Sequence, residues 1–242
     1  MLSTRPRGVP LTQRINASLL CRPDVPPGSG FFFVWRWHAN HSTHMSKIHE
    51  SPIHELHPTQ LTVGMIEVQD KKKRLMSLAP KDRQTFMHAH PIPAVLGPGD
   101  KLYITDHHHL GRAALEGGVT IGYFEVEADL SDHCIDDFWK EMDKNLWMHP
   151  LDEHGVRHYY AAIPDHLGKL IDDPYRSLAG YVRDAGGYKK TPTAFAEFAW
   201  ADFFRRTIPI ESLQADFAAA VHTALSLTHS KLASGLPGLK TK

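Results

Sequence analysis

The sequence predicts a single α+β domain in which a small sheet is followed by a C-terminal helical extension. Two apolar runs, 92–96 and 101–105, flank the turn formers Gly97-Pro98-Gly99-Asp100, which is typical of a β-hairpin. A third apolar run, 119–126, has strand character. Downstream, the aromatic residues of 193–206 recur every three or four positions, which is the period of an α-helix.

The other elements follow from periodicity and from the positions of glycine and proline. Residues 62–68 are expected to form a strand or a tight turn into a helix. The expected helices are 71–78, 82–88, 110–115, 135–147, 163–170, 175–184, 193–206 and 210–227. This order predicts an α/β core over 53–128, a helical extension over 129–227 packed on it, and a flexible tail over 228–242.

Composition fits one globular domain whose charge is unevenly distributed. The 242 residues are 42% apolar and 22% charged, which suffices for an ordinary core. Residues 1–44 hold five arginines and one acid, Asp24, so the rest of the chain has a small excess of acids. Such a mildly acidic body is a poor electrostatic footprint for gripping a duplex through its phosphates. We therefore expect no tight binding of duplex DNA.

Residues 1–44 are aperiodic and acid-poor, and two interpretations compete for them. One is a targeting peptide, and the other, which we favour, is an extension upstream of a true start at Met45. No stretch approaches the ~20 apolar residues that span a bilayer. The run 31–35 is too short and too late for a signal-peptide core. We expect a cytoplasmic protein with no membrane partner.

The segment Asp106-His107-His108-His109 is the strongest candidate for chemistry, because it ends a predicted strand and precedes a predicted helix. Unpaired backbone N–H groups and the helix dipole favour an anion at such a helix start. Histidine adds a donor whose charge can switch near neutral pH. The alternative is that Asp106 only caps the helix and that the histidines are solvated.

Three further groups are weaker candidates. The basic run Lys71-Lys72-Lys73-Arg74 could gather phosphates, although such runs are more often solvated helix faces. His88 and His90 could act as metal ligands together with the histidines of 107–109, although single histidines in loops are usually not ligands. The acids, histidine and cysteine of 129–137 suit a metal, but acids at a helix start are more often capping residues. Phe195, Phe198, Trp200, Phe203 and Phe204 are expected in the core.

The segment 91–113 resembles the signature of the ParB/sulfiredoxin superfamily. Pro91-Ile92-Pro93-Ala94-Val95 matches its Pro-Ile-x-x-Val strand, and residues 106–113 match an Asp-x-His-His-x-x-x-Ala box. Residues 61–68 fit its opening element. The branch that this chain most resembles is that of the ParB-like nucleases, a bacterial-type group. The resemblance covers 53–126 well and implies a small mixed sheet, with the helical part to about Ile210 as an extension.

The resemblance also implies roles for single residues. Asp106 and Glu67 occupy the positions of the Asp and Glu that assist phosphoryl transfer in small-molecule kinases of the superfamily. His108 and His109 would contact phosphate. His107 stands where the box usually has Gly, and Leu110 stands where it usually has Arg. Arg112 would have to supply the lost bidentate cation.

Together these observations predict a phosphoryl-transfer enzyme, either a nuclease-like hydrolase or a nucleotide-dependent phosphotransferase. Catalysis would rest on Glu67 and Asp106. Phosphate would be bound by His107, His108, His109 and Arg112, with Lys71, Lys72 and His90 as further contacts. Mg²⁺ at Asp106 and a nucleotide such as ATP, ADP or CTP are the expected cofactors. A non-enzymatic partition-type protein that binds nucleotide or DNA, and a degenerate scaffold, remain open alternatives.

Overall fold

The computed structural model describes residues 48–240, so the predictions made for residues 1–44 lie outside the described residues. Within this range the main sheet has the strand order β1-β5-β3-β4. The strands are β1 Ile48–Pro52, β3 Ile92–Gly97, β4 Lys101–Ile104 and β5 Ile121–Asp129. β3 and β5 run parallel, whereas β1 is antiparallel to β5 and β4 to β3. The sheet is therefore mixed, and the hairpin and the α+β class are confirmed.

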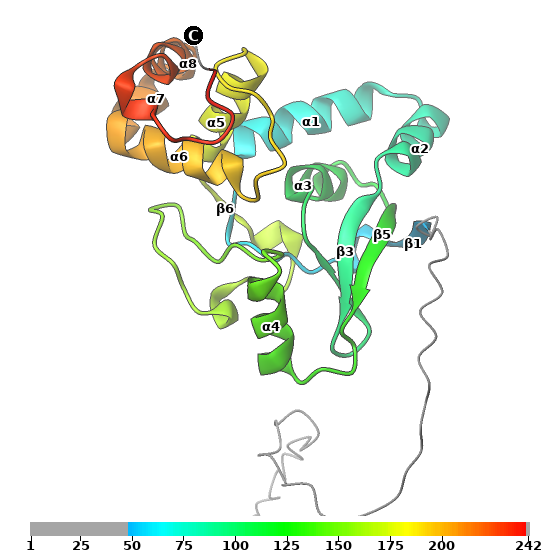
Figure 1. Cartoon of the computed structure of the whole chain (residues 1–242). Helices are drawn as coiled ribbons and strands as arrows, with labels where there is room; N and C mark the ends of the chain where they lie inside the picture. The colour runs from blue at the N-terminus through cyan, green and yellow to red at the C-terminus, as the bar shows by residue number, and fades with distance from the viewer. Residues whose placement is uncertain (1–47, 241–242) are drawn as a thin grey trace, which may run out of the picture.

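Neighbouring side chains of the sheet point to opposite faces, and each face has its own helices (Figure 1). Ala94 and Ile104 pack with α1 (Met65–Ser77), α2 (Pro80–Ala89) and α3 (His108–Glu116) in one apolar cluster. Val95 and Tyr103 pack with α4 (Ile135–Lys144) in another. α4 thus packs on the sheet core.

The helical unit forms a third apolar cluster beside α1 (Figure 1). Its helices are α5 Pro174–Asp184, α6 Ala196–Thr207, α7 Ile210–Ala215 and α8 Phe217–Thr228. A parallel pair of short strands, β2 (Thr62–Val63) and β6 (Ile171–Asp172), joins this unit to the segment before α1. Because β2 and α1 come from one continuous segment, α1 is placed between α3 and α5, and it packs against both.

Several predicted elements differ from the structure. Residues 62–68 are a two-residue strand followed by a helix that begins at Met65. The helix expected over 163–170 is only the 3-10 turn Leu167–Lys169, and further 3-10 turns occupy Ile53–Glu55, Tyr160–Ala162 and Lys231–Ala233. The helix expected over 210–227 is divided at Asp216, whose side chain accepts a hydrogen bond from the amide of Ala219 and so starts α8 as a new helix.

The end of the described chain is docked, in contrast to the flexible tail expected from 228 onward. The indole N–H of Trp200 donates to the carbonyl of Pro237 at 2.8 Å, and the amide of Lys189 donates to the carbonyl of Gly238 at 2.8 Å. Gly238 has φ +73°, and a Cβ there would lie 2.1 Å from the carbonyl oxygen of Lys189. Only glycine fits this position, so the close approach of the two segments is built into the sequence.

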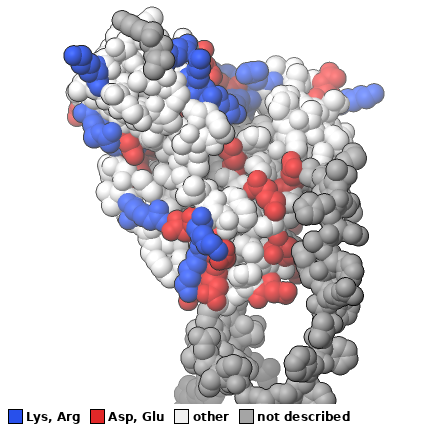
Figure 2. All heavy atoms as spheres, in the orientation of Figure 1, with Lys and Arg blue, Asp and Glu red and all other residues white. Residues whose placement is uncertain are grey.

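None of the helices within residues 48–240 combines the length and the apolar character that a bilayer crossing requires. On the face shown in Figure 2, Lys and Arg side chains lie mainly at the top and at the lower left, and Asp and Glu side chains gather along the centre, so no basic track runs the length of this face.

Candidate functional site

The box forms the sharp turn between β4 and α3. His107 has φ +61°, a left-handed conformation that glycine adopts without strain, which explains why glycine is usual at this position. Its amide donates to the Asp106 carboxylate at 2.6 Å. α3 begins at His108, two residues earlier than expected, so His108 and His109 both lie in its first turn. The unpaired amides of that turn make the helix start electropositive.

Both buried histidines of the box use their Nε2 atoms to hold backbone amides. Nε2 of His108 accepts from the amide of Thr59 at 3.1 Å, and Nε2 of His109 accepts from the amide of Gly64 at 3.0 Å. Burial lowers the pKa of His109 to about 4 and that of His108 well below its usual value. Both rings are therefore neutral at pH 7, with the proton on Nδ1. This differs from the expected histidine whose charge switches near neutral pH.

Glu67 lies in the first turn of α1, with its carboxylate toward α3 and α5. Oε1 accepts a hydrogen bond from Nζ of Lys71 at 2.7 Å, and Oε2 lies 3.5 Å from Nε2 of His109. Burial alone would raise the pKa of Glu67, but His109, Lys71 and Arg176 together lower it, so the carboxylate is ionised at pH 7. Oε2 is buried without a hydrogen-bond partner. A Cβ on Gly180 would lie 2.7 Å from Oε2, so α5 can approach this carboxylate only through a glycine.

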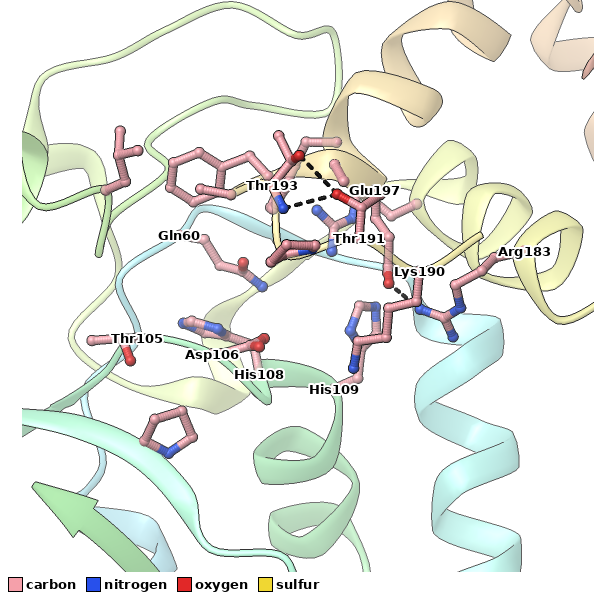
Figure 3. Close-up of a pocket in the computed structure, with 18 of the residues that line it drawn as sticks. Gln60, Thr105, Asp106, His108, His109, Arg183, Lys190, Thr191, Thr193 and Glu197 are labelled. Atoms are coloured by element: carbon pink, nitrogen blue, oxygen red, sulfur yellow. Dashed lines mark hydrogen bonds and ion pairs between the residues drawn. The ribbon is translucent and has the colours of Figure 1, made fainter. Parts of the chain in front are cut away.

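A cleft with two arms opens in front of the box, between the sheet core and the helical unit, and Figure 3 shows the lining of the first arm. The arms measure about 520 and 530 Å³. Both arms share five lining residues: Asp106, His109, Arg183, Lys190 and Glu197. In Figure 3, Asp106 and His109 approach from the box, and Lys190 and Glu197 face them from the helical unit. Volumes of this size suit small ligands.

The two arms differ in chemical character. The first, which we term the Arg176 arm, is lined by Gln60, His108, Arg176 and the segment 188–198. The second, which we term the Phe86 arm, is lined by the carboxylate of Glu67, by Lys71 and Arg74, and by the apolar side chains Leu75, Leu78, Phe86 and Leu110. Glu67 and Asp106 thus border one arm, as expected from their positions in the sequence.

Not every predicted site residue reaches the cleft. Arg112 donates to Glu116 at 2.7 Å and to the carbonyls of Leu167 and Leu170, and it lines neither arm. It therefore does not replace the arginine that the box lacks. Lys72 lies 3.4 Å from the same Glu116 and also lies outside both arms.

His90 and His107, which were predicted to contact the ligand, line the Phe86 arm together with Lys71 and His109. His90 does so with its ring stacked on Phe86 at 4.1 Å. His107 also lines this arm, and its Nδ1 atom is buried without a partner. Within residues 48–240, and so also in the acidic segment 129–137, no three His, Cys, Asp or Glu side chains are arranged to hold a metal ion.

The structure adds residues from the helical unit that the sequence did not single out. Arg176, Arg183 and Lys190 bring positive charge to the cleft, and Phe195 and Phe198, expected in the core, line it instead. Trp200, Phe203 and Phe204 are buried as expected. One signal for Arg176 was available. Small residues follow it at Ala179 and Gly180, three and four positions later, which indicates a helix face packed closely against a neighbour.

Comparison with known proteins identifies the family to which the chain belongs. Residues 49–206 match the family described as "Putative ParB-like nuclease". The crystal structure of protein Atu1540 from Agrobacterium tumefaciens is similar, with a TM-score of 0.75 and 38% sequence identity. The similarity covers 81% of this chain and 99% of that one. No curated protein matches the chain. The matched range includes the helical unit through most of α6, so both walls of the cleft lie within it.

Proposed function

Because the chain belongs to the family of ParB-like nucleases, we propose that its cleft binds a phosphate ester and catalyses phosphoryl transfer. The acceptor would be water, in a nuclease-like hydrolase, or a hydroxyl group, in a nucleotide-dependent phosphotransferase. One observation carries this proposal: two carboxylates, Glu67 and Asp106, line one arm of a cleft at the electropositive start of α3.

The phosphate would bind at the first turn of α3, where the free amides and the helix dipole favour an anion. The Nδ1–H group of His109 would act as a neutral donor there, because burial keeps this ring uncharged at pH 7. Lys71, Arg183 and Lys190 line the cleft and would neutralise charge on the transferred group. In this proposal the histidines fix the backbone around the site through the amides of Thr59 and Gly64, and lysine and arginine side chains supply the positive charge.

Glu67 would orient the attacking water or hydroxyl and accept its proton. Its carboxylate is ionised, and the buried Oε2 has no hydrogen-bond partner, so this oxygen would be able to accept a proton from the nucleophile. Asp106 is exposed at the junction of the two arms. From there it would orient the nucleophile from the opposite side of the phosphate.

Mg²⁺ fits Asp106 only together with a phosphate. Proteins usually bind Mg²⁺ through one or two carboxylates plus the phosphates of the substrate, and Asp106 offers one such carboxylate. When bound, the metal would supply Lewis-acid stabilisation of the phosphate oxygens.

The cleft favours a small substrate over a duplex. Each arm has the volume of a small-molecule site. The apolar side chains of the Phe86 arm would contact a nucleobase, and the cations that line the two arms would contact the phosphates of the same nucleotide. A nucleotide is therefore the substrate class that we propose.

The test is a thermal-shift screen with ATP, ADP and CTP, with and without Mg²⁺, followed by chromatography of each nucleotide after incubation. A nucleotide at 100 times its dissociation constant adds about 2.7 kcal/mol of stability, which such a screen detects readily. We expect a shift with at least one nucleotide, and a product that is absent from the Asp106→Asn variant. Absence of any shift and of any product would leave only the degenerate scaffold.

A non-enzymatic nucleotide-binding protein is the second candidate. It is favoured by the two neutral histidines, which are committed to backbone amides and so supply no acid or base. This candidate predicts a thermal shift without any product, so the same experiment separates it from the enzyme.

A further inference from the structure

Arg176 is a buried cation whose charge no carboxylate contacts directly. It lies in the first turn of α5 with 5% of its surface exposed. Its Nε and Nη1 atoms have no hydrogen-bond partner. Its guanidinium lies over the ring of Phe198, with the central carbon 3.3 Å from the ring centroid. Arginine is rarely buried without a partner, because its donors lose their hydration.

The acids nearest to Arg176 are already engaged by other cations. Glu197 binds Arg183, Asp173 binds Arg205 at 2.5 Å, and Glu67 binds Lys71 at 2.7 Å. Among the described residues, Arg176 itself forms no ion pair within 4.0 Å. The positive charge of Arg176 is thus not neutralised by a direct contact with any carboxylate of the described residues.

Arg176 lines the Arg176 arm of the cleft, where a second side-chain donor also lacks a partner. Gln60 lines this arm, and its Nε2 atom is likewise buried without a partner. Gln60 precedes β2 and Arg176 lies in α5 of the helical unit, so the two donors come from different segments of the chain. Two unpaired donors that line one cavity are the features expected of an anion site.

We propose that Arg176, assisted by Gln60, binds an oxyanion of the ligand in this arm and thereby supplies the cation that the box lost at Leu110. The proposal rests on the proposed function for the identity of that oxyanion, which is a phosphate group. The arginine comes from the helical unit, so a ligand phosphate bridges the two walls of the cleft. A planar guanidinium binds two oxygens of a phosphate at once, whereas lysine offers a single point of charge.

The first measurement is isothermal titration of the full-length chain with inorganic phosphate at low salt. We expect Arg176→Met to weaken phosphate binding at least tenfold and Arg176→Lys to weaken it less. Titration with oxalate distinguishes a carboxylate site from a phosphate site, and tighter binding of oxalate than of phosphate would overturn the assignment. Unchanged phosphate affinity in Arg176→Met, or no phosphate binding by the wild type, would overturn the proposal itself.

The second measurement separates a binding role from a structural one. Methionine has a similar shape but no charge to desolvate, so Arg176→Met should melt at the same temperature as the wild type or higher. The matched control is Arg112→Met, which removes an arginine that is fully engaged outside the cleft. This control should melt at a lower temperature and bind phosphate normally. A fall in melting temperature for Arg176→Met as large as that of the control would assign Arg176 to the structure instead.

Neither measurement depends on turnover, so the anion site and the proposed reaction can be tested separately. Phosphate binding that depends on Arg176 in a protein without hydrolase or transferase activity would refute the proposed reaction and support this site. If Arg176→Met left both turnover and phosphate affinity unchanged, the proposed reaction would stand and the anion site at Arg176 would be refuted.

Discussion

Nε2 of His109 accepts a hydrogen bond from the backbone amide of Gly64 at 3.0 Å. This contact fixes the first turn of α3 to the residue that immediately precedes α1. Glu67 lies in the first turn of α1, three residues after Gly64, so the same contact sets the position of its carboxylate relative to the box. The second histidine of the box has a parallel task, because His108 holds the amide of Thr59. The histidines therefore hold the cleft walls in place.

His109→Ala should lower the stability of the protein. The substitution leaves the buried amide of Gly64 without an acceptor, which costs about 1–3 kcal/mol. Urea denaturation at pH 7 measures the loss, and His90→Ala, at an exposed position, serves as the control. Because His109 is neutral at pH 7, the variant should weaken phosphate binding more than it moves any pH optimum. A stability equal to that of the control would contradict the assigned role of the ring.

Stability should fall as the pH drops below about 6.5, and His149 should contribute to the fall. Burial lowers the pKa of His149 to about 3, so between pH 6.5 and pH 3 the unfolded state binds a proton that the folded state does not. Stability from this group is complete above pH 6.5 and is lost on acidification. His149→Phe keeps a ring against Phe198 and should reduce the slope of unfolding free energy by about 1.4 kcal/mol per pH unit near pH 5. Parallel slopes for the two proteins in urea titrations from pH 7 to pH 4.5 would show that the native ring is protonated.

Asp106→Asn should abolish turnover or Mg²⁺-dependent nucleotide binding with little change in melting temperature. The side chain is exposed, and an asparagine oxygen can still accept the hydrogen bond from the amide of His107. The variant therefore removes charge and keeps shape. Nucleotide thermal shifts and product formation are the measurements. Wild-type turnover in the variant would remove Asp106 from the proposed mechanism.

The backbone at His107 predicts an unusual pattern of substitutions. Its left-handed conformation costs a branched side chain about 1–2 kcal/mol, and glycine avoids the cost. His107→Val should therefore destabilise the protein, and His107→Gly should leave its stability within about 1 kcal/mol of the wild type or raise it. Thermal denaturation of both variants tests this. A valine variant as stable as the glycine variant would contradict the turn geometry.

Duplex DNA should bind weakly. The chain outside residues 1–44 has more acids than bases, and the face in Figure 2 shows no continuous basic track. A mobility shift at about 150 mM salt, where phosphate-dominated contacts are already weakened, is the measurement. Sub-micromolar binding that depends on sequence would favour a partition-type protein over a small-molecule enzyme.

The sequence was sufficient for the part of the fold that local patterns determine. The hairpin of β3 and β4 was visible in two apolar runs around a glycine-rich turn, and the box was placed correctly between β4 and α3. β1 was missed because Ile48–Pro52 is short and mostly exposed, and it is a strand only because β5 pairs with it. The helix expected over 163–170 contains Pro164 and Gly168, and these residues prevailed over its apolar pattern.

Only the part of the candidate site that lies in recognisable local patterns could be predicted from the sequence. Glu67 and Asp106 lie in segments with a recognisable pattern, so their meeting in one arm could be anticipated. Arg176 and Lys190 reach the cleft because the helical unit packs across α1, and no local pattern encodes that long-range contact. Arg112 was expected to bind phosphate because it lies near the box in the sequence, but it does not line the cleft. Its side chain instead donates to the carbonyl of Leu167 in the 3-10 turn Leu167–Lys169.

The docking of Gly238 on Lys189 has a practical consequence for anyone who produces this protein. The segment that it pins leads directly into Lys190 and Thr191, which line the cleft. A deletion beyond Thr228 would remove Gly238 and with it this support, so a shortened form of the protein should keep the residues that follow α8.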